Sequence, residues 1–154
     1  MLVYRICNTL YANDINGIGA KLYGGRWNNA GNAVVYTSSS RALAALEVLV
    51  HLPPKNVKPI DFSIVVIEVP ENSMEEINYA EIYNELKVNG LNSNFKSIGD
   101  NWLKKNTSML LKVPSVVMPE EFNYLINPLH KDFHKVKIKE TKLFRFDERL
   151  VVKG

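Results

Sequence analysis

Short apolar runs alternate with polar, glycine-containing segments along the chain. Runs of four to eight residues that are rich in β-branched and aromatic side chains are typical of strands. Such runs lie at 2–7, 33–37, 62–69, 109–113 and 122–127. The run at 62–69 is the most strongly apolar, so we expect it near the centre of a sheet.

Two short segments near the C-terminus, 136–138 and 143–146, alternate apolar and charged residues and predict a half-exposed antiparallel pair. Segment 75–86 has helical potential with weak periodicity. Residues 97–100 predict a turn into a short helix, with Asp100 as its cap and Trp102 packing inward. Strands and helices follow one another without a regular strand–helix–strand rhythm. The predicted fold class is therefore α+β, with mostly antiparallel strands.

One helix is expected from the serines at 38–40 to about Leu52, where Pro53 and Pro54 stop it. Its apolar face carries a carboxylate, because the helical period aligns the set Leu43, Leu46, Glu47 and Val50. An unpaired buried carboxylate is costly, so Glu47 needs a partner or a water-lined pocket. Arg26 is the nearest obvious cation in the sequence.

Arg26 and Trp27 follow a loop, predicted over 13–25, that is rich in asparagine and glycine. Tight turns explain such glycines more often than ligands do, and neither of the two nucleotide-binding glycine fingerprints is present. Glycine backbone can nevertheless approach a phosphate closely, which makes Gly25 a candidate contact. A guanidinium beside it suits bidentate binding of a phosphate or carboxylate.

Three more side chains are candidates for a site. Tyr36 ends a buried strand and serves either as core or as a hydrogen-bonding aromatic group. Ser115 lies at a proline-broken step, where its hydroxyl either bonds the local backbone or faces a cleft. No base is placed to activate it, so a hydrolase triad is not predicted. Arg5 lies inside the first predicted strand; from the residues alone, an edge-strand charge reaching solvent is favoured over a cation aimed into a cleft.

The totals fit one domain over residues 1–154, with 46% hydrophobic and 23% charged residues. The net charge of +3, without a run of basic residues, does not indicate nucleic-acid binding. The single cysteine excludes an internal disulfide, and the three histidines lack a third ligand for a metal. No signal peptide or membrane-length apolar run is apparent, so cytoplasmic localisation is expected.

The joint order of these motifs resembles the RES-domain toxin family, which is named for an arginine, a glutamate and a serine in that order. The three would be Arg26 in G-G-R-W-N, Glu47 in A-L-A-A-L-E and Ser115 in V-P-S-V-V. Further matches are Tyr4-Arg5, Gly31, V-V-Y-T-S, N-Y-L-I-N-P and F-D-E-R-L. The resemblance spans essentially the whole chain, although 71–98 matches nothing assignable.

This resemblance implies a fold similar to the ADP-ribosyltransferases and a toxin of a bacterial toxin–antitoxin pair that splits the nicotinamide–ribose bond of NAD. It implies no cofactor: NAD is the substrate, and water or inorganic phosphate is the acceptor. The implied partner is an antitoxin, usually with a helix-turn-helix part, that covers the active site. Direct nucleic-acid or membrane binding is not expected, and a homodimer within the complex is compatible with the resemblance.

The family's catalytic set would be Arg26, Glu47 and Ser115, and Arg5, Gly25 and Tyr36 would bind substrate. Glu47 would stabilise the ribosyl cation, and Arg26 would bind the pyrophosphate or an incoming phosphate. Ser115 would hold the carboxamide or a phosphate oxygen.

Two alternatives stay open: ADP-ribosyl transfer to a macromolecule, and a non-enzymatic binding module with a structural Glu47–Arg26 ion pair. RNA cleavage is disfavoured, because the three histidines show no paired acid–base arrangement.

Overall fold

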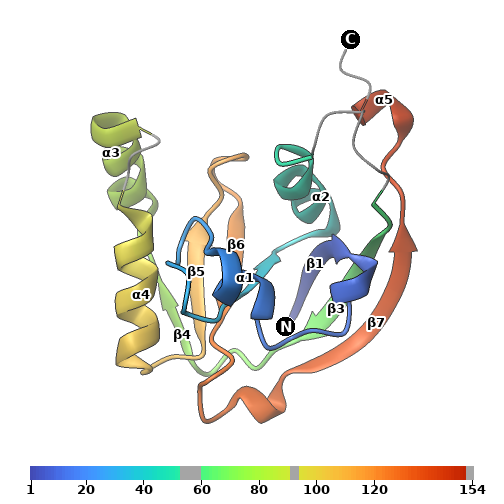
Figure 1. The fold of residues 1–154 in the computed structure, drawn as a ribbon. Helices are drawn as coiled ribbons and strands as arrows, with labels where there is room; N and C mark the ends of the chain where they lie inside the picture. The colour runs from blue at the N-terminus through green and yellow to red at the C-terminus, as the bar shows by residue number, and fades with distance from the viewer. Residues whose placement is uncertain (53–59, 91–93, 152–154) are drawn as a thin grey trace.

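One seven-stranded sheet forms the frame of the computed structural model, which describes residues 1–52, 60–90 and 94–151 (Figure 1). Within these residues the strands are β1 (Leu2–Asn8), β2 (Val35–Ser38), β3 (Phe62–Glu68), β4 (Met74–Glu76), β5 (Leu110–Pro114), β6 (Phe122–Ile126) and β7 (Lys137–Phe144). Their order is β4-β5-β6-β2-β1-β3-β7, and only the pair β4–β5 is parallel. The predicted α+β class with mostly antiparallel strands is confirmed.

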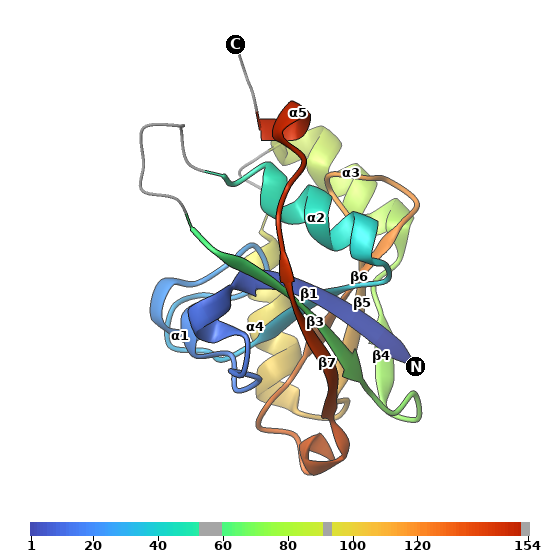
Figure 2. The same cartoon turned by 90° about the vertical axis from the view of Figure 1, so that its right-hand side faces the viewer.

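Short helices flank the sheet. They are η1 (Thr9–Tyr11), α1 (Ile18–Tyr23), α2 (Arg41–Leu49), α3 (Tyr79–Asn89), α4 (Phe95–Lys105), η3 (Phe133–Lys135) and α5 (Glu148–Val151). Figure 1 shows α3 and α4 beside β4 and β5, and in Figure 2 α2 lies above β1, β3 and β7. Among the described helices, none is long and apolar enough to cross a membrane.

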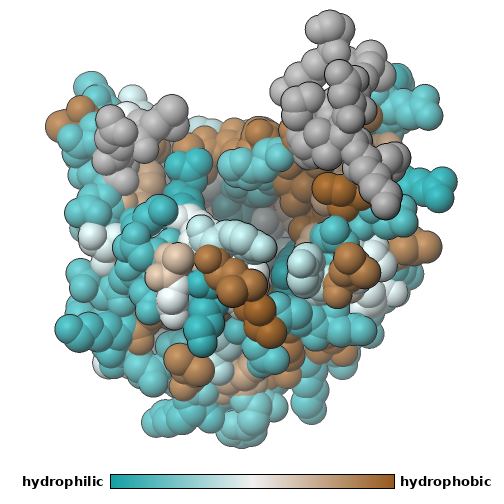
Figure 3. Space-filling view, viewed as in Figure 1, coloured by the Kyte–Doolittle hydropathy of each residue, from teal (hydrophilic) through white to brown (hydrophobic). Residues whose placement is uncertain are grey.

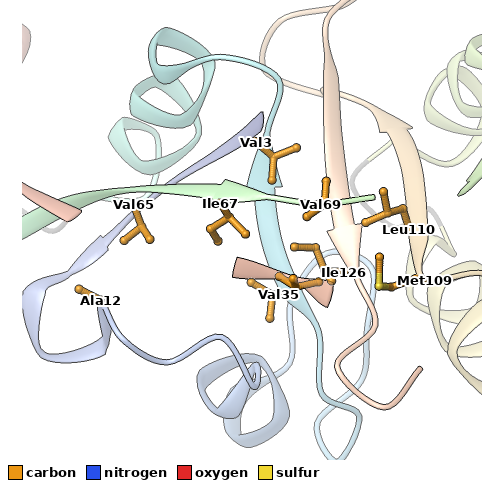
Figure 4. Close-up of a cluster of buried hydrophobic side chains, with 10 residues drawn as sticks. Val3, Ala12, Val35, Val65, Ile67, Val69, Met109, Leu110 and Ile126 are labelled. Atoms are coloured by element: carbon orange, nitrogen blue, oxygen red, sulfur yellow. The ribbon is translucent and has the colours of Figure 1, made fainter. Parts of the chain in front are cut away.

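The main hydrophobic cluster lies on one face of the sheet. Successive side chains of a strand point to opposite faces, so alternate residues share this cluster. Figure 4 shows its central members, which include Val3, Val35, Val65, Ile67, Leu110 and Ile126. The loop residue Ala12 and Met109 complete it, and all these side chains are buried.

Two separate clusters cover the opposite face. The first joins β5 and β6 to α3 and α4 through Leu111, Val113, Leu125, Ile82, Phe95 and Trp102, and it includes Trp27 from the glycine-rich loop. The second joins β1 and β3 to α2 through Ile6, Ile64 and Ala44. We call them the α4 cluster and the α2 cluster.

Five strands begin and end within two residues of the predicted runs. The predicted antiparallel pair 136–138 and 143–146 is wrong: this segment forms one strand, β7, which pairs with β3. Arg5 is not an edge-strand charge, because β1 lies between β2 and β3. The central run at 62–69 becomes β3, one strand from the edge, because the charged strand β7 covers its outer side.

The helices differ more from the prediction. A short helix, α1, interrupts the expected loop 13–25, and α3 begins three residues after an unpredicted strand, β4. Asp100 does not cap a helix, because α4 already begins at Phe95, but Trp102 is buried as predicted. The helix α2 ends at Leu49, earlier than the predicted Leu52, and Pro53 and Pro54 lie outside the described residues.

Candidate functional site

A cavity of about 560 Å³ opens on the sheet face between the α2 cluster and the α4 cluster. In Figure 3 the surface is hollowed beside α2, with hydrophobic residues at the rim. Three neighbouring strands build the floor with alternate side chains: Tyr4 and Ile6 from β1, Tyr36 and Ser38 from β2, and Asn123 and Leu125 from β6. The strand register explains this grouping, since Ser38 lies opposite both Tyr4 and Asn123.

Glu47 stands on the wall that α2 provides. The helix begins after Ser40, whose Oγ accepts a hydrogen bond from the Leu43 amide at 3.0 Å. Helical spacing then places Glu47 on the same side as Ala44 and Val48, and all three line the cavity. The stripe differs from the predicted one, because Val50 is exposed.

The Glu47 carboxylate is held by one of its two oxygens. Its Oε1 accepts hydrogen bonds from the Ser115 hydroxyl at 2.7 Å and from the Asn123 amide at 2.6 Å. Its Oε2 accepts none from the residues that the structure describes. One oxygen is thus fixed by the protein, and the other is left for a ligand.

Ser115 makes the local backbone bonds considered from the sequence and also donates to Glu47. Its Oγ accepts hydrogen bonds from the amides of Val117 at 3.1 Å and Met118 at 2.9 Å, and its proton goes to Glu47. The residue is only 3% exposed and does not line the cavity, although Pro114 and Val116 do. In this geometry Ser115 orients Glu47 rather than touching a ligand.

Asn123 and Ser38 were missed in the sequence analysis. The Ser38 hydroxyl donates to Asn123 Oδ1 at 2.7 Å, which turns the Asn123 NH₂ group toward Glu47. One signal was present: Asn123 and Leu125 alternate along the predicted strand at 122–127, inside the motif N-Y-L-I-N-P. The pairing of β6 with β2 was not readable from the sequence.

Tyr36 fastens the loop that carries Arg26. Its hydroxyl accepts a hydrogen bond from the Trp27 amide at 3.0 Å and donates to Asn28 Oδ1 at 2.6 Å. Burial raises the pKa of Tyr36 to about 12, although the Trp27 amide acts in the opposite direction. A Cβ on Gly25 would lie 2.5 Å from the Tyr36 hydroxyl, so this close approach requires glycine.

Arg26 lines the same cavity and is half-buried. Its guanidinium makes neither a hydrogen bond nor an ion pair with any described residue. The Glu47–Arg26 ion pair of the binding-module alternative is therefore not formed in the described part of the chain. Both charged groups face the cavity without neutralising each other by direct contact.

The helix α4 supports this loop from outside. Asp100 accepts hydrogen bonds from the Asn29 amide at 3.1 Å, from Asn29 Nδ2 at 2.6 Å and from Asn32 Nδ2 at 2.8 Å. Trp27 stacks on Phe95 with ring centroids 4.9 Å apart. A Cβ on Gly99 would lie 1.7 Å from the Trp27 carbonyl oxygen, so this helix and the loop are in direct backbone contact.

Arg5 contributes to the lining, but its guanidinium donates to the carbonyl oxygen of Asp14, in the segment before α1. Among the described residues, no group of three or more His, Cys, Asp or Glu side chains could hold a metal ion. Apart from Arg26, Glu47 and a few polar groups, the cavity lining is mostly apolar and aromatic. A lining of this kind, in a cavity of this size, is typical of small-molecule sites.

Comparison with known proteins places these residues in a family. The model of the RES domain matches residues 2–147. The chain is 40% identical to "Prs ADP-ribosylating toxin" of Sphingobium sp. (strain YBL2), covering 95% of this chain and 92% of that protein. It is 37% identical to "Toxin Res" of Photorhabdus laumondii, covering 98% and 97%, and 36% identical to "Toxin Res" of Yersinia enterocolitica, covering 97% and 99%.

The fold is similar to a chain in the crystal structure of the M. tuberculosis MbcT–MbcA toxin–antitoxin complex. The TM-score is 0.73 at 13% identity, and the match covers 93% of this chain and 83% of the other. With a family match over residues 2–147 and relatives 36–40% identical over nearly the whole chain, this protein belongs to the RES domain family.

Proposed function

We propose that the chain is the toxin of a toxin–antitoxin pair and that it cleaves the nicotinamide–ribose bond of NAD. One observation carries the proposal. Glu47 lines a cavity of small-molecule size, its Oε1 is held by Ser115 and Asn123, and its Oε2 accepts no hydrogen bond from a described residue. An oriented carboxylate at the edge of a largely apolar cavity suits stabilisation of a developing positive charge.

In the reaction, the bond between C1′ of the ribose and the pyridinium nitrogen breaks. The electron pair goes to nitrogen, so nicotinamide leaves as a neutral molecule and positive charge develops on C1′ and the ring oxygen. Glu47 stabilises this charge and can accept a hydrogen bond from a ribose hydroxyl. An acceptor oxygen then forms the new bond to C1′ and releases its proton to solvent.

Arg26 suits the anionic part of the substrate. Its guanidinium is not engaged by any described residue and can bind the pyrophosphate in bidentate fashion. Phosphorolysis would use the same cation to receive inorganic phosphate and would give a ribosyl phosphate product. Hydrolysis would use water and give free ADP-ribose. In the apolar lining, Tyr36 offers its ring to the substrate, since its hydroxyl proton is already donated to Asn28.

The first test is the variant Glu47→Gln, assayed for nicotinamide release with and without inorganic phosphate. We expect kcat to fall by about 100-fold or more, because the amide cannot supply the negative charge, while NAD binding changes little. Glu81→Gln, which alters an exposed carboxylate on α3, is the matched control and should behave as the wild type. Wild-type turnover in Glu47→Gln would refute the assignment.

The product identifies the acceptor. A ribosyl phosphate that forms only when phosphate is present indicates phosphorolysis, and ADP-ribose in both buffers indicates hydrolysis. Mass spectrometry of the two reactions separates these outcomes.

A second candidate is ADP-ribosyl transfer to a protein. The printed name of the Sphingobium relative describes that activity, and the relative is 40% identical to this chain. The same cavity and the same Glu47 would serve, with a nucleophile of the target protein as acceptor. Labelled NAD incubated with a bacterial lysate separates the two: Glu47-dependent labelling of a protein band favours transfer, and small-molecule products alone favour NAD degradation.

We also propose a protein antitoxin as the partner, of the helix-turn-helix type and covering the cavity. The similarity to a chain from a toxin–antitoxin complex supports it, and the exposed Tyr23 at the cavity lining is an apolar contact that such a partner could cover. A homodimer within that complex stays a prediction. Growth arrest on expression of the wild-type chain, relieved by Glu47→Gln, would support the toxin assignment.

A further inference from the structure

We infer that Asn123 is a positioning residue for the Glu47 carboxylate, and that Ser38 acts on Glu47 only through Asn123. This inference rests on the proposed function, because it assigns a task within the same site. It adds two residues that stand outside the arginine, glutamate and serine of the family's name.

The sheet register brings the two residues together. Ser38 at the end of β2 and Asn123 near the start of β6 are directly opposite each other in the antiparallel pair. Side chains of directly opposite residues lie within hydrogen-bonding reach on one face of a sheet. The hydroxyl of Ser38, which is 4% exposed, donates to Asn123 Oδ1 at 2.7 Å.

That bond holds the Asn123 amide in the orientation that the Glu47 carboxylate requires. With Oδ1 engaged by a donor, Nδ2 points to Glu47 Oε1 and donates at 2.6 Å. The reversed amide would set Oδ1 against the carboxylate oxygen, with no proton between two acceptors. The carboxylate therefore sets the amide orientation, and the Ser38 hydroxyl holds the amide in it.

Asn123 and Ser115 together fix the plane of the carboxylate. Their donors reach Oε1 from two different elements, β6 and the residue that follows β5. The two donors leave Oε2 for the ligand. They also restrain the rotation of the Glu47 side chain, which the backbone of α2 alone would not do. Misplacement of a catalytic group by about 1 Å can cost roughly 100-fold in rate.

The test is a double-mutant cycle of Asn123→Ala and Ser38→Ala, measured as kcat and KM for NAD. A hydrogen bond to a charged group is worth enough that Asn123→Ala should lower kcat by about 10- to 100-fold, with KM within about threefold. Ser38→Ala should lower kcat by about threefold to tenfold in the wild-type background. In the Asn123→Ala background it should have no further effect, because its only path to Glu47 is gone.

Asn127→Ala is the matched control. Asn127 directly follows the same strand and is 1% exposed, and its Nδ2 donates to Asn106 Oδ1 at 2.8 Å, away from the cavity. It should lower the midpoint of thermal unfolding while kcat of the folded protein stays unchanged. Loss of kcat in Asn127→Ala equal to that in Asn123→Ala would show a structural effect only and overturn the inference.

The other possible results of these experiments distinguish a failure of this inference from a failure of the proposed function. Wild-type kcat in Asn123→Ala, with Glu47→Gln inactive, overturns the inference and leaves the proposed function standing. Equal effects of Ser38→Ala in both backgrounds overturn the role assigned to Ser38. If folded wild-type protein released no more nicotinamide than Glu47→Gln, the proposed function would fail and the inference with it. If Asn123→Ala did not fold, Asn123→Asp would replace it, since the aspartate keeps an acceptor for Ser38 but loses the donor to Glu47.

Discussion

Tyr36 serves the cavity floor and the Arg26 loop with one side chain. Its ring lines the cavity, while its hydroxyl joins the Trp27 amide to the Asn28 side chain. The nearest loop backbone, at Gly25, has no side chain between it and this hydroxyl. The Tyr36 hydroxyl is therefore one of the contacts that hold the loop carrying Arg26 in place.

Tyr36→Phe should weaken NAD binding more than it slows chemistry. Loss of the hydroxyl leaves the Trp27 amide and the Asn28 oxygen without their partner, which costs about 1–3 kcal/mol of unfolding free energy. The loop loosens, so KM for NAD should rise several-fold while kcat falls less. Steady-state kinetics and urea denaturation measure both effects, and Tyr124→Phe, whose hydroxyl bonds no described residue, is the control.

Alkaline titration tests the same hydroxyl independently of activity. The folded pKa of Tyr36, about 12, lies above its ordinary value of 10.0. The neutral phenol therefore stabilises the fold fully below pH 10, and this contribution is lost as the pH rises through 12. Ultraviolet absorbance should show a late tyrosine ionisation, and Tyr36→Phe should remove that step. Retention of the late step in the variant would contradict the assignment.

At the scale of an element, α4 packs against the loop that carries Arg26 and holds it in place. Gly99 lets the helix reach the Trp27 carbonyl, and the same helix supplies Phe95, which stacks on Trp27, and Asp100, which accepts hydrogen bonds from Asn29. Burial opposes ionisation of Asp100, but the hydrogen bonds from Asn29 and Asn32 outweigh it and hold its pKa below the ordinary 3.8. The helix so fixes the loop without contributing a side chain to the cavity lining.

Asp100→Ala should loosen the contact between α4 and the Arg26 loop. Three hydrogen bonds are lost at a partly solvent-exposed position, so we expect a loss of about 1 kcal/mol in unfolding free energy and a higher KM for NAD. The folded pKa of Asp100 is depressed, so its stabilisation is present above pH 3.8 and is lost as the pH falls through the folded value. The difference between the wild type and the variant in urea should therefore shrink in acid.

Lys104→Ala, in the last turn of α4, is the control for this experiment. It leaves the loop contacts in place, so KM should stay at the wild-type value. An unchanged KM in Asp100→Ala would show that α4 does not help to position Arg26.

At the scale of the whole molecule, the two faces of the sheet have different tasks. One face carries the main hydrophobic cluster, and the other carries the cavity between the α2 and α4 clusters. Neighbouring residues of one strand therefore point to opposite faces, one to the main hydrophobic cluster and the next to the face that carries the cavity. Leu110 and Leu111, both fully buried in β5, are such a pair.

Leu110→Ala and Leu111→Ala should separate stability from activity. Each removes a buried leucine and should cost about 2–5 kcal/mol of unfolding free energy. Leu110→Ala empties space on the far face, so the folded protein should keep its kcat and KM. Leu111→Ala disturbs the cluster that holds Trp27 and should also raise KM. Equal effects on KM would show that the faces are coupled.

Most strands can be predicted from the sequence because a short run of apolar, β-branched residues is a local property. The runs at 2–7 and 62–69 match Leu2–Asn8 and Phe62–Glu68 within a residue, but they do not predict the order of these strands in the sheet. The short strand β4 was missed because Met74–Glu76 carries two charges and becomes a strand only by pairing with β5. Long-range pairing of this kind leaves no local signal.

The charged residues of the candidate site could be predicted from the sequence, but the contacts that these residues make could not. Arg26 and Glu47 both line the cavity, but their side chains form no ion pair with each other in the structure. Ser115 follows a strand 68 residues from Glu47 in the chain, and Asn123 is 76 residues away. Only the register of β2, β5 and β6 brings their donors to one carboxylate oxygen.

The separation of the α2 cluster from the α4 cluster has an evolutionary consequence. Glu47 stands on a wall packed by one cluster, and the Arg26 loop is packed by the other, so substitutions behind one wall need not disturb the opposite wall. Substitutions around the guanidinium can therefore alter substrate binding while the contacts of the carboxylate stay in place. Selection for a new binding preference can thus act on the Arg26 wall without loss of the hydrogen bonds to Glu47.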